Sequence, residues 1–345
     1  MVYRIRTFVS AAFALLVAVA ALSAAAPGNA HAATGLFAPD SIWNKPIPAD
    51  AQLDPSSPSA VREIVRQATP IKLGGFGVGI STTRYGVPIF KVGATQARVP
   101  VKLDTTSPVL SAAFAAGVPI PANAAPAPGT DANLAVYQPA TDTMWEFWRL
   151  SKQADGWHAQ WGGKMTQVSQ NPGVYRDLKN ADGKTYFQRC WWGAPSSKFP
   201  LMAGVITIDE MRAGVIPHAL MLSLHETKAG VYSAPAQATD GKSTLADAVP
   251  MGTQFRLAPT VNVETLAVAP AMKVILRAAQ RYGVVVGNQS GGVGFRAEDP
   301  AQFGSNPWPG LFGMEDWRLM NQFPWSKLQM LKIPQLRTGH CSNWA

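Results

Sequence analysis

The chain has few charges and few cysteines, and it lacks the motifs on which several common enzyme classes depend. Only 15% of its 345 residues are Asp, Glu, Lys or Arg, and only two are cysteine. It contains no Gly-x-Ser-x-Gly turn, no Walker phosphate loop and no His-Glu-x-x-His zinc motif. Residues 74–79 are rich in glycine but lack dinucleotide-binding spacing, which indicates a glycine-rich strand or bend. We therefore expect no cofactor and no metal.

Composition and patterning also exclude several fold classes. A hydrophobic fraction of 47% is too high for a disordered chain, and 30 glycines and 28 prolines are too many for a helical bundle. No internal repeat occurs, which disfavours a propeller or a β-helix. No cluster of five or more Lys and Arg residues occurs, so we expect no nucleic-acid partner.

Acidic residues are absent from the first 32 positions. Arg4 and Arg6 precede a small and apolar run over residues 7–26, and Ala30-His31-Ala32 has the small-x-small pattern of a signal-peptidase site. We interpret residues 1–32 as a signal peptide, which makes the protein secreted or periplasmic. An uncleaved anchor is the alternative, because about 20 apolar residues can span a bilayer. No later segment has a membrane-spanning pattern.

The positive charge favours certain partners over others. Removal of Arg4 and Arg6 lowers the formal net charge from +9 to +7. In an exported protein this charge favours an anionic polysaccharide, a teichoic acid or an acidic cell surface. The alternative is that the charge only aids solubility.

The two cysteines are Cys190 and Cys341. In an oxidising compartment an isolated pair is most simply a disulfide, which would join the C-terminal segment to the middle of the chain. The alternative is a thiol nucleophile at Cys341 beside His340.

Hydrophobic periodicity predicts many short strands and few helices. Helices are expected where Pro follows a capping position, after Ser57 and from Pro270 to Tyr282. Residues 119–130 form a Pro/Ala-rich connector, interpreted as a crossover within one domain. The pattern predicts a mainly β fold, an antiparallel β-sandwich or jelly roll with a few short helices, in a single monomeric domain over 33–345. Strands are expected at 74–80, 85–92, 97–103, a meander over 134–168, 204–208, 216–225, 253–257 and 284–286.

Tryptophan is abundant, and all 11 tryptophans lie after residue 32. An indole ring stacks on the apolar face of a sugar while its N–H reaches a hydroxyl, so a Trp-lined groove is typical of glycan binding. A role in the core is the alternative for each of them. The candidate substrate-binding residues are Trp145, Trp148, Trp157, Trp161, Trp191 and Trp192, together with Arg149 and Arg256.

Glu146 is the acid most closely associated with these aromatics. Strand alternation places it on the same face as Trp148, where desolvation would raise its pKa, as in the general acid of a glycosidase. A cross-strand ion pair is the alternative. A hydrolase needs a second carboxylate, for which the candidates are Asp131, Glu210, Asp142, Asp209 and Asp240.

His218 is the second catalytic candidate, within the apolar run 216–224. It could act as the base of a polysaccharide lyase, assisted by a Tyr and by a charge-neutralising Arg. A histidine on such an apolar face can equally be a satisfied core residue.

Five segments resemble, in the same order, a group of exported bacterial proteins that are described only as hypothetical. The likeness covers most of residues 36–335 and implies a single exported module, but it transfers no catalytic residue. The segments are SIWN at 41–44, WEFW at 145–148, IPHAL at 216–220, GTQFRL at 252–257 and RYGV at 281–284.

The sequence therefore predicts an exported glycoside hydrolase that acts on an extracellular or cell-wall polysaccharide. Two alternatives stay open. One is a polysaccharide lyase that uses His218, and the other is a non-catalytic glycan-binding or adhesion protein.

N-terminal sequencing of secreted material should begin at Ala33, because Ala30 and Ala32 supply the small residues that signal peptidase requires. Recovery of the intact chain in membranes would contradict this prediction.

Overall fold

The computed structural model describes Met1 and residues 35–176, 178–179, 185–186 and 192–338. Residues 2–32 of the predicted signal peptide, the two cysteines and Trp191 lie outside these described residues. The described residues from 35 onward belong to one compact unit. Within the described part of the chain, no helix has the length and apolar character needed to cross a bilayer.

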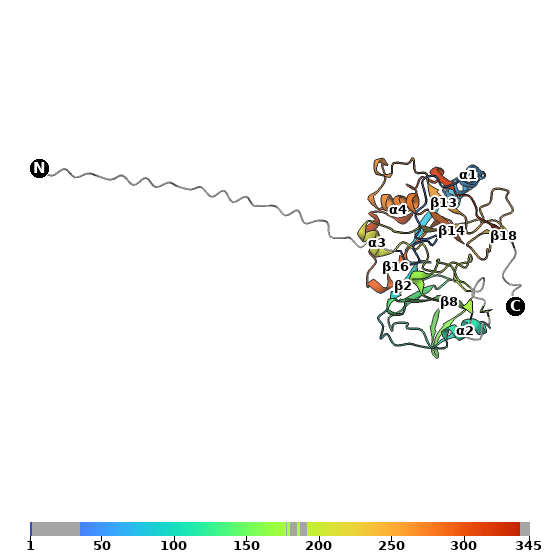
Figure 1. Ribbon diagram of the computed structural model, residues 1–345, viewed down its shortest axis with the longest axis vertical. Coiled ribbons are helices and arrows are strands. Elements are labelled where there is room, and N and C mark those ends of the chain that lie inside the picture. Colours follow the sequence, from blue (N-terminus) through green and yellow to red (C-terminus); the bar gives the residue numbers. More distant parts are fainter. Residues whose placement is uncertain (2–34, 177, 180–184, 187–191, 339–345) are drawn as a thin grey trace. The chain divides into compact units, whose positions relative to one another are not determined.

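The larger sheet has six strands. In spatial order they are β1 (Val78–Ser81), β15 (Val293–Arg296), β11 (Leu220–Leu224), β14 (Val284–Gln289), β13 (Gln254–Leu257) and β17 (Leu328–Met330). The central strands β11 and β14 run parallel to each other. Every residue of β11 and the first four of β14 are buried, so helices and loops cover both faces of the sheet here. Figure 1 shows β13 and β14 in the same half of this unit as α1 and α4.

The second sheet has five strands and lies in the other half of the unit, where Figure 1 shows β2, β8 and α2. Its strands, in spatial order, are β16 (Glu298–Asp299), β2 (Val87–Lys91), β4 (Leu134–Gln138), β5 (Thr143–Trp148) and β8 (Trp161–Thr166). Strands β4, β5 and β8 pair antiparallel, whereas β2 runs parallel to β4 and to β16.

One continuous segment joins the two sheets. Residues 293–299 form β15 in the six-stranded sheet and then β16 in the five-stranded sheet. At the junction, Ala297 donates its N–H to the carbonyl of Ser81 and accepts from the N–H of Val87. Ile206 bonds the same segment on both sides, because its N–H donates to Arg296 and its carbonyl accepts from Glu298. The sheets are therefore connected by both the covalent chain and backbone hydrogen bonds.

Smaller elements surround the two sheets. A three-stranded sheet consists, in spatial order, of β3 (Val101–Leu103), β7 (Gly156–Ala159) and β6 (Ser151–Gln153). One two-stranded sheet pairs β12 (Val231–Ser233) with β18 (Leu336–Thr338). Another pairs β9 (Leu178–Lys179) with β10 (Thr185–Tyr186). The α-helices are α1 (Ser57–Ala68), α2 (Pro108–Phe114), α3 (Ile208–Ala213), α4 (Pro270–Arg281), α5 (Trp308–Phe312) and α6 (Asp316–Met320). The 3₁₀ turns are η1 (Ile71–Leu73), η2 (Pro139–Thr141), η3 (Val168–Gln170), η4 (Val263–Thr265), η5 (Pro300–Phe303) and η6 (Trp325–Lys327).

The sheets are mixed, which corrects the prediction that they are antiparallel throughout. Parallel pairing occurs at β1–β15, β11–β14, β2–β4, β16–β2 and β3–β7. Alternation shows that a segment is extended but not which neighbour it meets, and long crossovers bring distant strands side by side. The predicted meander also departs from expectation, because β5 pairs directly with β8, while β7 pairs with β6 on one side and with β3 on the other.

Helix-capping signals in the sequence locate α1 and α4 correctly, since each helix has Pro in its first turn. The prediction of a strand over 204–208 is wrong, because α3 begins at Ile208. Thr207 and Glu210 form a complete capping box at its N-terminus, a signal that is readable in the sequence.

Candidate functional site

A cleft lies where the two sheets meet. It has two sections, with cavity volumes of about 730 Å³ and 460 Å³. The first section is bordered by β1, β15 and the segments 82–85 and 288–292, and the second by β5, β8 and the segments 194–198 and 240. Four residues line both sections and make them neighbours: Asp131, Asn288, Gln289 and Arg296.

Glycine forms much of the wall in the first section. Gly79 of β1 lies opposite Gly294 of β15 in the parallel register, and both line the cleft. A Cβ atom on Gly294 would lie only 1.9 Å from the carbonyl oxygen of Gly79. Only glycine at position 294 therefore permits this strand pairing.

Two tryptophans form an aromatic surface in the second section. Trp148 and Trp161 are direct partners in the antiparallel β5–β8 pair, so their rings project from the same face. The Trp148 indole N–H donates to Oδ1 of Asp131 at 3.1 Å, which orients a cleft carboxylate beside the ring. The Arg149 guanidinium lies 4.4 Å from the centre of the Trp148 ring. Of the predicted substrate-binding residues, Trp148 and Trp161 therefore line the cleft. Arg149 does not line it but lies over the Trp148 ring.

Glu146 lies behind the cleft rather than in it. Its side chain is 0% exposed, and its two carboxylate oxygens accept from the backbone N–H groups of Ala194 and Leu201 at 2.6 and 2.7 Å. Burial raises the pKa of Glu146 to about 7, although both backbone hydrogen bonds oppose the shift. The predicted pKa shift is present, but no open groove adjoins this carboxylate. Glu146 instead anchors residues 194–201, and Ser196 and Lys198 of this segment line the cleft.

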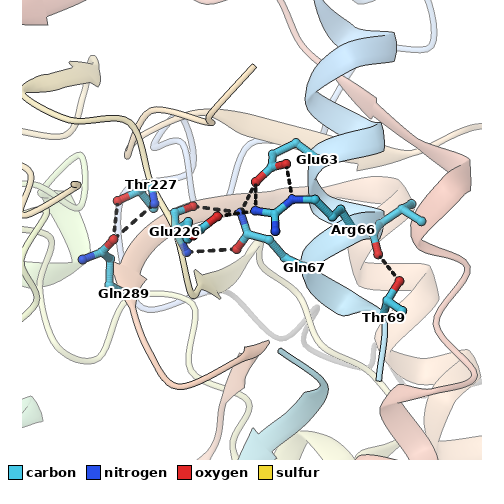
Figure 2. Close-up of polar contacts among 8 residues, drawn as sticks. Glu63, Arg66, Gln67, Thr69, Glu226, Thr227 and Gln289 are labelled. Atoms are coloured by element: carbon cyan, nitrogen blue, oxygen red, sulfur yellow. Dashed lines mark hydrogen bonds and ion pairs between the residues drawn. The ribbon is translucent and has the colours of Figure 1, made fainter. Parts of the chain in front are cut away.

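A polar network connects α1 to Gln289, which lines both sections of the cleft (Figure 2). Gln67 exchanges two hydrogen bonds of 3.0 Å with the backbone of Glu226, and Arg66 bonds to Glu63 and Glu226. The next residue along, Thr227, donates to Oε1 of Gln289 from both its N–H and its hydroxyl. The Gln289 amide then donates to the carbonyl of Asp240. This network fixes the positions of two cleft residues, Gln289 and Asp240.

Four of the predicted substrate-binding residues are in the core instead. Trp145, Trp157 and Trp192 are buried, and none of them lines the cleft. Arg256 is 5% exposed, and its guanidinium donates to Gln329 and to the carbonyls of Pro48 and Ala49. These assignments to a glycan-binding surface are therefore corrected. Strand alternation shows which side chains share a face, but it does not show which face the rest of the chain covers.

His218 and Glu210 are paired with each other, away from the cleft-lining residues. Nε2 of His218 lies 2.9 Å from Oε1 of Glu210, and Nδ1 lies 2.9 Å from the carbonyl oxygen of Ala219. Burial lowers the pKa of His218, but the charge of Glu210 and the hydrogen bonds raise it more, so the net shift is upward. Burial likewise raises the pKa of Glu210, and the charge and hydrogen bond of His218 outweigh that effect. With both ring nitrogens engaged, His218 has no nitrogen available as the base of a lyase.

Of the remaining acidic candidates, two line the cleft and two bind other parts of the chain. Asp131 and Asp240 line the second section of the cleft. Asp142 accepts from the Tyr137 hydroxyl and from Ser169, and Asp209 lies on α3 near Arg212. Sequence reasoning missed Arg296, Lys198, Asn133, Asn288 and Gln289, because no motif marks them and chain segments far apart bring them together.

Comparison of the chain with protein-family models, curated proteins and solved structures finds no match. Among the described residues, no group of three His, Cys, Asp or Glu side chains is arranged to hold a metal ion. The chemistry of the cleft therefore carries the functional proposal.

Glu210→Gln should lower the free energy of unfolding by about 2 to 4 kcal/mol at pH 5.5, because it leaves a buried imidazolium without its carboxylate. The loss of stability should be largest between pH 4.5, the ordinary pKa of Glu210, and pH 6.5, the ordinary pKa of His218. It should shrink as the pH rises through the raised pKa of His218 or falls through the lowered pKa of Glu210. Urea unfolding across this range checks the prediction, with the exposed Glu264→Gln as a control that leaves the transition nearly unchanged.

Glu146→Gln should remove part of the pH dependence of stability. The pKa of Glu146 is about 7 in the folded chain against an ordinary value of 4.5, so folding takes up a proton between these values and wild-type stability falls as the pH rises. The contribution lost over this range is on the order of 3 kcal/mol. Urea unfolding at pH 4.5 and 7.5 measures it. Glu298→Gln, which removes another buried carboxylate of pKa about 7, should retain the Glu146 contribution. An unchanged slope in Glu146→Gln would refute this account.

Proposed function

We propose that this chain is an exported enzyme that cleaves a polysaccharide by hydrolysis, with the cleft between the two sheets as its active site. The observation that carries the proposal is the placement of Trp148, Trp161 and Asp131 in one cleft section, with Asp131 hydrogen-bonded to the Trp148 indole. A ring surface beside an oriented carboxylate is the arrangement that holds a sugar and acts on its glycosidic bond.

Asp131 and Asp240 are the carboxylates we assign to the reaction, since both line this section. In hydrolysis, one carboxylic acid gives a proton to the leaving glycosidic oxygen as the carbon–oxygen bond breaks. The other carboxylate either attacks the anomeric carbon itself or takes a proton from the water molecule that attacks it. In both routes water supplies the new anomeric hydroxyl group, and its second proton goes to a carboxylate of the pair. Glu146 supports this site indirectly, because it anchors residues 194–201.

The form of the cleft supports a polymeric substrate. Its two sections meet at Asp131, Asn288, Gln289 and Arg296, so the reacting group lies where neighbouring binding regions join. Amide side chains such as Asn288 and Gln289 can both donate to and accept from sugar hydroxyls. If the cleft binds a polysaccharide but does not cleave it, the protein is a non-catalytic glycan-binding protein.

Incubation of the purified protein with a panel of neutral and acidic polysaccharides tests the proposal. New reducing ends without ultraviolet-absorbing unsaturated sugars support hydrolysis, and unsaturated products would instead identify a lyase. Retention of a polysaccharide without any product would identify a binding protein.

Asp131→Asn should lower turnover by about 10²-fold or more while leaving the fold intact, because Asp131 is a partly exposed side chain that supplies a proton or a charge at the reacting bond. Trp148→Ala should mainly raise KM, through loss of the stacking surface. Initial rates over a range of polysaccharide concentrations separate the two effects. Asp50→Asn, an exposed acid outside the cleft, is the matched control. Wild-type turnover in Asp131→Asn would remove this residue from the site.

A further inference from the structure

Among the described residues, no ion pair is formed by the buried cation Arg296. Its side chain is 6% exposed and lines both sections of the cleft, and its Nη1 atom is buried without a hydrogen bond. Asp131 and Glu146 act on it only through their charges, which oppose the downward effect of burial on the pKa of Arg296. A buried guanidinium normally has several of its donors paired, so this one is available to a ligand.

Lys198 is a second cation in the same section. Among the described residues its ammonium group has no hydrogen bond or ion pair, and it lies 5.6 Å from the centre of the Trp161 ring. Its backbone has φ of 63°, in the left-handed region that a lysine rarely adopts. The segment that Glu146 anchors at Ala194 and Leu201 therefore holds Lys198 at the cleft in a strained conformation.

Other orphaned polar groups lie in the same wall. Oδ1 of Asn133 and Nε1 of Trp161 are buried and have no hydrogen bond to any residue that the structure describes, and both residues line this section. An acceptor and several donors without partners, gathered in one cavity section, are the pattern left by a polar ligand that completes them.

We infer that Arg296 and Lys198 form a subsite for a singly charged oxyanion carried by the sugar chain, so that the substrate is an acidic glycan. The planar fork of Arg296 matches a uronate carboxylate or a phosphodiester, and Lys198 adds a second charge beside the Trp161 ring. This inference rests on the proposed function, because it names the class of polysaccharide that the cleft accepts.

Calorimetric binding of an oligouronate and of its carboxyl-reduced, neutral counterpart to the wild-type protein tests the inference. The oligouronate should bind at least about tenfold more tightly, since its carboxylate gains charge-assisted hydrogen bonds. Arg296→Met should weaken oligouronate binding about 10- to 100-fold and leave binding of the neutral oligomer nearly unchanged. Arg296→Lys should lie between, because it keeps the charge and loses the fork. A phosphodiester-linked glycan in a parallel arm identifies the source of the oxyanion.

Two controls separate a ligand-binding role from a structural one. Arg277→Gln removes the same charge from the surface of α4, where Arg277 pairs with Glu264, and should leave the preference for the acidic oligomer intact. The melting temperature of Arg296→Met should not fall, because the substitution removes a buried charge that has no partner. If Arg296→Met does not fold, the arginine is structural, and Lys198→Met together with the wild-type comparison decides whether the subsite exists.

Equal affinity of the wild type for the acidic and neutral oligomers would overturn the inference while leaving the proposed function standing. The same preference in Arg296→Met and in the wild type would overturn the role of Arg296. Failure of the wild type to bind either oligomer, or any polysaccharide of the panel, would overturn the proposed function as well.

Discussion

The position of one cleft wall depends on a single buried carboxylate. Glu146 projects from the middle of β5, and its two oxygens accept hydrogen bonds from the backbone N–H groups of Ala194 and Leu201, which are seven residues apart in the chain. A carboxylate without solvent is unfavourable, and the two backbone donors offset only part of that cost, because burial still raises the pKa of Glu146 to about 7. The same bonds fix a segment that contains no helix or strand over residues 194–201. Thus a core strand determines where Ser196 and Lys198 meet the aromatic surface of the cleft.

The second constraint comes from strand direction. The parallel pair β11–β14 places the chain segments that follow these two strands at the same edge of the six-stranded sheet. Residues 225–227 and 288–292 therefore lie close together, and the side chain of Gln289 can bond both to Thr227 and to Asp240. Ligand sites in parallel sheets are commonly built at the carboxyl ends of strands for the same reason. Here the antiparallel β5–β8 pair supplies the opposite, aromatic wall.

Local sequence signals predicted those features that depend on local forces. The capping prolines located α1 and α4, and alternation correctly grouped Glu146 with Trp148 on one face of β5. Long-range contacts decided the rest. Residues 194–201, which arrive about 50 positions later, cover Glu146 and leave Trp148 in the cleft, although both side chains project from that face. Arg296 carried no signal at all, because what distinguishes it is a buried Nη1 atom without a hydrogen bond among the described residues, and no sequence pattern reports that. The pairing of His218 with Glu210 was equally invisible, although the capping box that positions Glu210 could be read directly.

The continuity of residues 293–299 has a mechanical consequence. Hinged enzymes close around a ligand by rotating one lobe against another about a few loop residues. In this chain, rotation of one sheet against the other would break the hydrogen bonds of Ala297 to Ser81 and Val87 and those of Ile206 to the same segment. The width of the cleft is therefore set before any ligand arrives, and a ligand meets walls that already have their final spacing. Little of its binding free energy is then offset by large-scale closure, so discrimination between ligands falls to the side chains that line the cleft.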